Sequence, residues 1–118
     1  VLVLLLLPWL VLVRPQAGIL DRVSVLRAED GSYAMVYSAS GQAFELDLRR
    51  LTGTELKAWW FDPRTGAATA IDSVNRPAER RPAPVLRTFT PPGSGPGQDW
   101  VLVLDDASRG YPAPGSAR

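Results

Sequence analysis

Two carboxylates near the middle of the sequence have a spacing that could do chemistry. Glu45 and Asp47 alternate with apolar residues, so an extended strand would place both on one face, about 7 Å apart. Paired carboxylates of this kind can hydrolyse glycosides. However, a half-buried strand shows the same alternation with its acidic residues in water. We therefore expect Glu45 and Asp47 to lie on a solvated sheet face, and we assign them no catalytic role.

Three aspartates near the end of the chain are the next candidates. Asp99, Asp105 and Asp106 could offer carboxylate oxygens to calcium, but they do not follow the spacing of a calcium-binding loop. The sequence contains no histidine and no cysteine. The commonest general base, zinc-thiolate sites and disulfides are therefore excluded. We predict no catalytic residue, no metal site and no cofactor, so the chain by itself is not expected to be an enzyme.

The size and charge of the chain narrow its partners. Its 118 residues are enough for one domain with one core, and 46% of them are hydrophobic, as in globular proteins. Thirteen basic and twelve acidic residues give a net charge of +1. Because nucleic-acid binding requires a clustered positive charge, we predict no nucleic-acid partner. We also expect no membrane partner.

The aromatic run at residues 59–61 contains the candidate binding residues. In an extended strand, Lys57, Trp59 and Phe61 share one face and Trp60 lies on the other. An unpaired lysine is costly to bury, so its face should be the outer one. Trp59 and Phe61 would then form an exposed aromatic patch, which usually marks an interface. Trp60 is expected in the core.

Short alternating runs separated by turn residues recur from Ile19 onward. This pattern predicts an all-β fold, an antiparallel β-sandwich of about seven short strands. We expect the sandwich to span residues 19–106, with a loop at 72–84 and a disordered tail at 107–118. The strands are expected at residues 23–27, 33–37, 44–48, 55–61, 67–71, 86–90 and 100–105.

The first 18 residues are expected to lie outside the sandwich. Thirteen apolar residues, interrupted by Pro8, precede a linker over residues 14–18. A transmembrane helix needs about 20 apolar residues, so this segment is short for a span. We prefer the interpretation that it is the tail of an upstream domain. A signal-like or membrane segment is the alternative.

Four motifs in the same order resemble one known family. They are the runs DGSYAMVYS at 30–38, KAWWFDPRTG at 57–66, FTPPG at 89–93 and DWVLVLD at 99–105. These runs resemble the family described as the putative collagen-binding domain of a collagenase. The resemblance implies a β-sandwich that lies C-terminal to an apiosidase-like (β/α)8 glycoside hydrolase barrel in bacterial proteins. It also implies that the catalytic carboxylates belong to the barrel.

This resemblance leads to two functional hypotheses. The first is a non-catalytic accessory domain of a secreted or periplasmic enzyme, packing on the barrel of the same polypeptide through Trp59 and Phe61. The second is a module that binds a matrix polymer, either a polysaccharide or a collagen-like protein. The sequence does not identify the ligand, the substrate of the parent enzyme or the oligomeric state.

Overall fold

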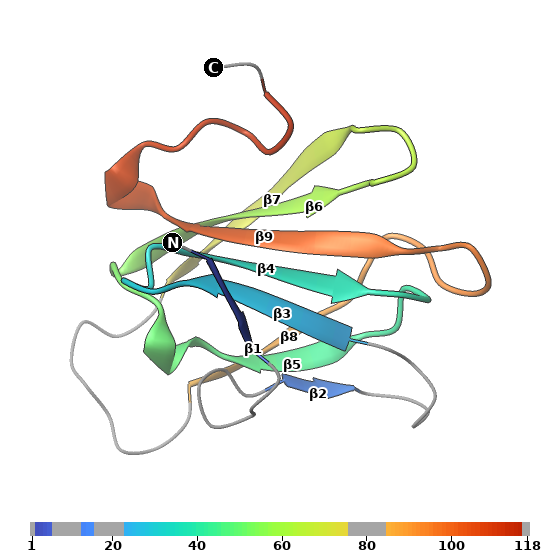
Figure 1. Ribbon diagram of the computed structural model, residues 1–118, viewed down its shortest axis with the longest axis horizontal. Helices are drawn as coiled ribbons and strands as arrows, with labels where there is room; N and C mark the ends of the chain where they lie inside the picture. The colour runs from blue at the N-terminus through green and yellow to red at the C-terminus, as the bar shows by residue number, and fades with distance from the viewer. Residues whose placement is uncertain (1, 6–12, 16–22, 76–84, 117–118) are drawn as a thin grey trace.

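Two antiparallel sheets facing each other make up the fold, which is seen in a computed structural model (Figure 1). The structure describes residues 2–5, 13–15, 23–75 and 85–116. Residues 16–18 of the linker expected over 14–18, and residues 76–84 of the loop expected at 72–84, lie outside the described residues. So does most of the apolar segment.

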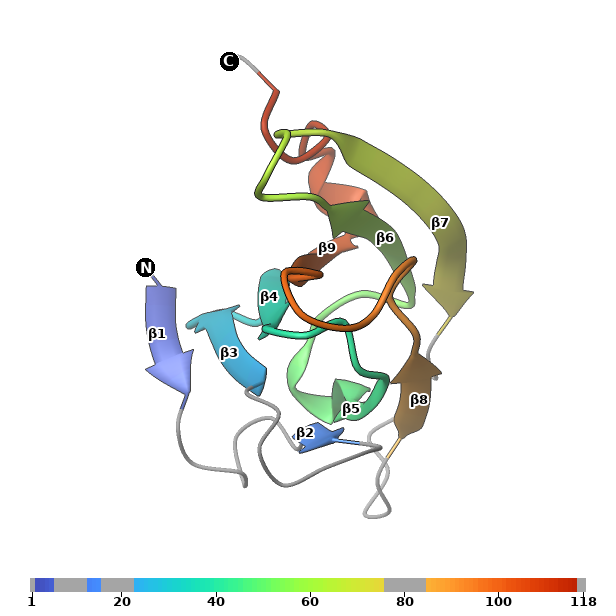
Figure 2. The same ribbon diagram turned by 90° about the vertical axis from the view of Figure 1, so that its right-hand side faces the viewer.

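The larger sheet has six strands, and every neighbouring pair is antiparallel. In spatial order the strands are β1 (Leu2–Leu5), β3 (Val23–Ala28), β4 (Tyr33–Ser38), β9 (Trp100–Asp106), β6 (Glu55–Phe61) and β7 (Ala68–Asn75). The smaller sheet consists of β2 (Val13–Pro15), β5 (Phe44–Asp47) and β8 (Leu86–Phe89). Figure 2 shows the larger sheet curving around β5. The predicted all-β sandwich is confirmed, with a strand in each of the seven expected segments.

The core fills the space between the two sheets. Phe44 from β5 meets Trp60 from β6 edge to face, with ring centroids 6.3 Å apart. Leu102 and Leu104 of β9 are fully buried beside them. Burial of such side chains contributes about 1.5–3 kcal/mol each, so this layer provides most of the stability. Trp60 is therefore a core residue, as predicted.

The turn between β3 and β4 shows how local sequence joins the strands. Gly31 adopts a φ of 77°, and a Cβ at this position would lie 2.5 Å from the carbonyl oxygen of Arg50. Only glycine satisfies both conditions. The carboxylate of Asp30 accepts a hydrogen bond from the backbone N–H of Ser32. Hydrogen bonding to the side chain and then to the backbone of Ser32 lowers the pKa of Asp30. The segment between β3 and β4 is therefore a tight turn.

One of the two strand carboxylates is not where the alternation placed it. Asp47 is 4% exposed and caps the short 3₁₀ helix η1 (Leu48–Arg50). Its oxygens accept hydrogen bonds from the backbone N–H groups of Arg49 and Val85 and from Nε of Arg49. The expectation that Asp47 faces water is wrong, because the strand ends at this residue and its side chain turns to cap η1 and to bind the backbone N–H of Val85. Glu45 is half-exposed.

Three boundaries also differ from the prediction. Residues 1–18 were expected to lie outside the sandwich, but β1 pairs with β3 and β2 pairs with β5, so both strands belong to its sheets. Strand β7 continues to Asn75, although residues 72–75 were expected to belong to a loop. The pairing of β6 with β7 is irregular between Leu56 and Ala58, and beyond it Leu56 pairs with Val74 and Glu55 with Asn75. The expected disordered tail is structured over residues 107–116, beginning with the 3₁₀ helix η2 (Ala107–Arg109).

Candidate functional site

The outer face of the six-stranded sheet carries the candidate site. Along β6, Leu56, Ala58 and Trp60 are buried in the core, whereas Trp59 and Phe61 are half-buried on the opposite face. The predicted orientation of this strand is therefore correct. We call the surface formed by the outward residues of β4, β9 and β6 the outer face. Its members are Tyr33, Met35, Tyr37, Val101, Val103, Asp105, Lys57, Trp59 and Phe61.

Strand register arranges these side chains in rows. Val103 of β9 pairs with Trp59 of β6, and Val101 pairs with Phe61. One row further, Asp105 lies between Tyr33 of β4 and Lys57 of β6. The outer face therefore has an apolar end near Phe61 and a charged end at Asp105.

The C-terminal segment, residues 110–116, packs over part of this face. Figure 2 shows it on the side of the larger sheet that faces away from β5. The Tyr111 ring lies edge-on to Tyr33, with centroids 6.0 Å apart, and its hydroxyl donates a hydrogen bond to the Ser32 hydroxyl. Gly115 has a φ of 77°, and a Cβ there would come within 3.0 Å of the Phe61 ring. These contacts explain why a Pro- and Gly-rich segment has a defined path.

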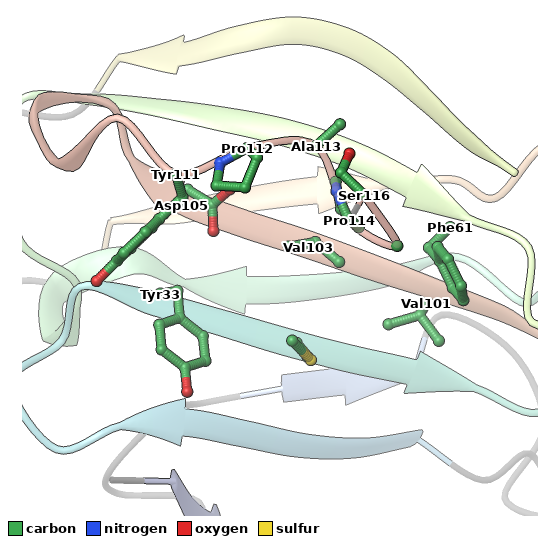
Figure 3. A pocket seen from close by; sticks show the side chains of 12 residues that line it. Tyr33, Phe61, Val101, Val103, Asp105, Tyr111, Pro112, Ala113, Pro114 and Ser116 are labelled. Atoms are coloured by element: carbon green, nitrogen blue, oxygen red, sulfur yellow. The ribbon is translucent and has the colours of Figure 1, made fainter. Parts of the chain in front are cut away.

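A pocket of about 380 Å³ remains between the C-terminal segment and the outer face. In Figure 3, Asp105, Tyr33 and Tyr111 gather at one end of it, whereas Phe61 and Val101 lie at the other. Volumes of 300–1,000 Å³ are typical of small-molecule sites. The twelve lining residues are Tyr33, Met35, Phe61, Val101, Val103, Asp105, Tyr111, Pro112, Ala113, Pro114, Gly115 and Ser116.

Asp105 is the charged residue among those twelve, and it is only 5% exposed. Desolvation raises the pKa of its carboxyl group, while the nearby positive charge of Lys57 acts in the opposite direction. Burial disfavours the ionised form of a carboxyl group unless a cation or hydrogen-bond donors compensate. The carboxylate accepts no hydrogen bond from any residue that the structure describes. The carboxylate of Asp105 therefore faces the pocket with few groups to stabilise its negative charge.

Trp59 lies on the same face but outside the pocket lining. Its indole N–H is buried and has no hydrogen-bond partner within the described part of the chain. Its neighbour on β7, Ala70, is exposed. A buried N–H without a partner costs free energy, so the indole of Trp59 leaves a hydrogen-bond donor unsatisfied on the outer face. The two predicted binding residues thus share a face, but only Phe61 borders the pocket.

The other acidic candidates do not come together. Asp99 accepts a hydrogen bond from the Tyr37 hydroxyl and lies 3.6 Å from Nε of Arg64. Asp106 turns to the opposite side and binds Thr52 and Ser108. Among the described residues, no group of three acidic or metal-ligating side chains could hold a metal ion.

The pocket was not predicted from the sequence. Asp105 follows four apolar residues and Tyr111 lies in a Pro- and Gly-rich tail, so neither has a local signal. A charged residue directly after an apolar strand was the available hint.

Comparison with known proteins relates the chain to carbohydrate-active enzymes. The model of the family described as "Putative collagen-binding domain of a collagenase" matches residues 10–105. A solved structure described as "Glycoside hydrolase" superposes with a TM-score of 0.66 at 26% identity, over 81% of this chain and 20% of that one. A glycoside hydrolase family 5 from Bacteroides vulgatus gives a TM-score of 0.61 at 25% identity, over 74% of this chain and 17% of that one. No curated protein matches. The chain thus spans about a fifth of the length of these structures, and no helix in its described portions is long and apolar enough to span a membrane.

Proposed function

The chain belongs to the family of putative collagen-binding domains of collagenases, and from this premise we propose that it is a non-catalytic accessory domain of a larger glycoside-hydrolase-like enzyme. It packs on the catalytic (β/α)8 barrel of the same polypeptide. The parent enzyme is secreted or periplasmic, in keeping with the polymeric substrates of such hydrolases.

The observation that carries this proposal is the unequal coverage of the structural matches. Most of this chain superposes on a fifth of a glycoside hydrolase, so four-fifths of that protein lies outside the match. A module that accounts for so small a part of its relatives fits an accessory role. A shared fold does not by itself transfer an activity, so the assignment also depends on the side chains.

The carboxylates of this chain support a non-catalytic role. Hydrolysis of a glycoside needs two carboxyl groups that flank one bond. Asp47 accepts three hydrogen bonds as a helix cap and forms an ion pair with Arg49 at 2.7 Å. It is therefore not available as a partner for Glu45.

The outer face is the surface we assign to docking. Trp59 and Phe61 are large aromatic side chains on a sheet whose opposite face already forms the core. Aromatic residues contribute strongly to protein interfaces, and an unpartnered apolar face is costly in water. The barrel of the same polypeptide would cover the part of the face around Trp59 that the C-terminal segment leaves open.

Replacement of Trp59 tests docking in the parent enzyme. In the isolated 118-residue chain, Trp59→Ala should leave a folded domain, because the side chain is only half-buried. In the parent polypeptide, the same change should lower the melting temperature further than in the isolated chain, since contacts to the barrel are lost as well. Trp59→Phe should recover most of this difference. Thr88→Ala, at an exposed position of the other sheet, serves as the surface control.

The alternative function is a module that binds a matrix polymer, either a polysaccharide or a collagen-like protein. The family description and the aromatic outer face favour it, since aromatic rings stack on sugars and pack on proteins. In this case Trp59→Ala would weaken retention of the parent on the insoluble polymer, without extra destabilisation. Equal melting shifts in both contexts together with unchanged retention would contradict both functions.

A further inference from the structure

The charged group of the pocket lining is a hydrogen-bond acceptor. Asp105 contributes a carboxylate with no hydrogen-bond donor among the described residues. The hydroxyl proton of Tyr111 is donated to Ser32, which leaves the oxygen lone pairs of Tyr111 free to accept. Pro112 and Pro114 have no backbone N–H, and the N–H of Ser116 bonds to the carbonyl of Ala113. A ligand for this pocket should therefore bring hydrogen-bond donors.

The charge and the rings of the lining point to a positive ligand. Asp105 gives the lining a single negative charge, since Lys57 is not among the lining residues. Tyr33 and Tyr111 meet at right angles beside it, and Phe61 closes the far end (Figure 3). Aromatic rings next to a carboxylate stabilise organic cations through their π faces and through charge-assisted hydrogen bonds.

The length of the pocket suggests how large the cation can be. The lining runs along β9 from Asp105 to Val101, a distance of about 13 Å at strand geometry. Between the two ends it is lined by Met35, Val103 and the proline rings. An apolar stem with one charged head fits this arrangement better than a compact, evenly polar molecule.

We propose that this pocket binds an organic cation, a primary ammonium or guanidinium group on an apolar stem, with Asp105 as its counter-ion. The rings of Tyr33 and Tyr111 flank the charged head, and the stem runs toward Phe61. A free amine and a Lys or Arg side chain of a polypeptide share this chemistry. The site belongs to the chain itself and does not require the barrel.

Lys57 limits the affinity without excluding the ligand. It pairs laterally with Asp105 in the strand register, yet the two side chains form no ion pair within 4.0 Å. Lys57 is half-exposed, so water screens its charge. We therefore expect dissociation constants of about 0.1–5 mM, typical of a single charged contact with a small ligand.

Binding can be measured by NMR titration of the 118-residue chain with defined probes. Nα-acetyl-lysine methylamide and Nα-acetyl-arginine methylamide carry the charged head on a peptide, and pentylammonium represents a free amine. Nα-acetyl-norleucine methylamide has a similar stem without charge, and glucose represents a neutral sugar. The charged probes should bind at least tenfold more tightly than both neutral probes. Tighter binding of the peptide probes than of pentylammonium assigns a polypeptide ligand, and the reverse assigns a free amine.

Asp105→Asn should weaken binding of the charged probes at least tenfold, because it removes the negative charge that pairs with the cation and keeps the shape of the side chain. Asp72→Asn makes the same charge change at an exposed position of β7 and should have no effect. For the unmodified chain, affinity should fall about tenfold per pH unit below the pKa of Asp105. The groups that face this carboxyl are Lys57, Tyr33 and Tyr111.

The pH series and the neutral probes keep the test decisive even if Asp105→Asn does not fold. Equal binding of charged and neutral stems, preference for glucose, or no saturable binding of any probe would each overturn the proposal. None of these results bears on docking to the barrel, so the two proposals fail independently.

Discussion

The two faces of the six-stranded sheet carry different kinds of side chain. The inner face presents mainly small and aliphatic side chains with Trp60; those of the core cluster are at most 5% exposed, whereas Val23, Ile71, Val74 and Trp100 of the same sheet are only partly buried. The outer face presents tyrosines, a methionine, Trp59, Phe61 and the Lys57–Asp105 row, most of them half-buried. Strand alternation assigns residues to the faces, but it does not determine what covers each one.

The elements that cover the two faces explain why their side chains differ. The smaller sheet seals the inner face, so any polar group there would lose its water. A seven-residue segment covers only part of the outer face and leaves a pocket of about 380 Å³ beneath it. Aromatic and ionisable side chains are retained where the covering is incomplete, and this is where a partner or ligand can contribute the missing contacts.

The largest expected effect is on the inner face. Trp60→Ala should lower the free energy of unfolding of the 118-residue chain by about 3–5 kcal/mol, because it leaves a cavity against Phe44. Trp59→Ala should cost clearly less in the same chain. Urea denaturation measures both. If Trp59→Ala unfolds the chain while Trp60→Ala does not, the two faces have been assigned the wrong way round.

A smaller effect on the free energy of unfolding is expected from the two neighbouring aspartates of β9, Asp105 and Asp106. Asp106 accepts hydrogen bonds from the Thr52 hydroxyl at 2.7 Å and from Ser108, and these bonds lower its pKa. A carboxyl whose folded pKa is depressed stabilises the fold above its unfolded pKa. Asp106→Asn should therefore cost about 1–2 kcal/mol at neutral pH, since charged hydrogen bonds are lost.

The pH dependence identifies the cause of that loss. As pH falls through the folded pKa of Asp106, below the ordinary value of 3.8, the unfolding free energies of the two proteins should converge. Asp105 is expected to affect the free energy of unfolding in the opposite direction. Burial raises the pKa of its carboxyl group, so the stability that this group contributes is lost as the pH rises through its folded pKa. An Asp106→Asn loss that persists unchanged at low pH would show that the carboxylate charge is not the cause.

Most of the strands could be predicted because their pattern is local. Alternation at residues 44–48 and 55–61 identified both strands and the side of most of their residues, including the opposite sides of Trp59 and Trp60. Alternation predicted the wrong environment for Asp47, because this residue ends the strand and caps the 3₁₀ helix that follows. Pattern alone also ended β7 too early, since three of the four residues 72–75 are polar and their strand structure depends on pairing with β6.

The candidate site depended on contacts that no local pattern contains. Tyr111 meets Tyr33 across 78 positions of sequence, and Gly115 meets Phe61 across 54. The tail over residues 107–118 was predicted to be disordered. Residues 110–116 nevertheless have a defined path, because Tyr111 contacts Tyr33 and Ser32 and Gly115 lies against Phe61.

Hydroxyl-radical footprinting of the outer face tests the central claim most directly. Labelling of Trp59 is compared between the isolated 118-residue chain and the intact parent enzyme, with Trp100 as an internal reference from the loop end of the sheet. If the outer face docks on the barrel, labelling of Trp59 should fall several-fold in the parent while Trp100 changes little. Equal labelling of Trp59 in both proteins would contradict docking through this face.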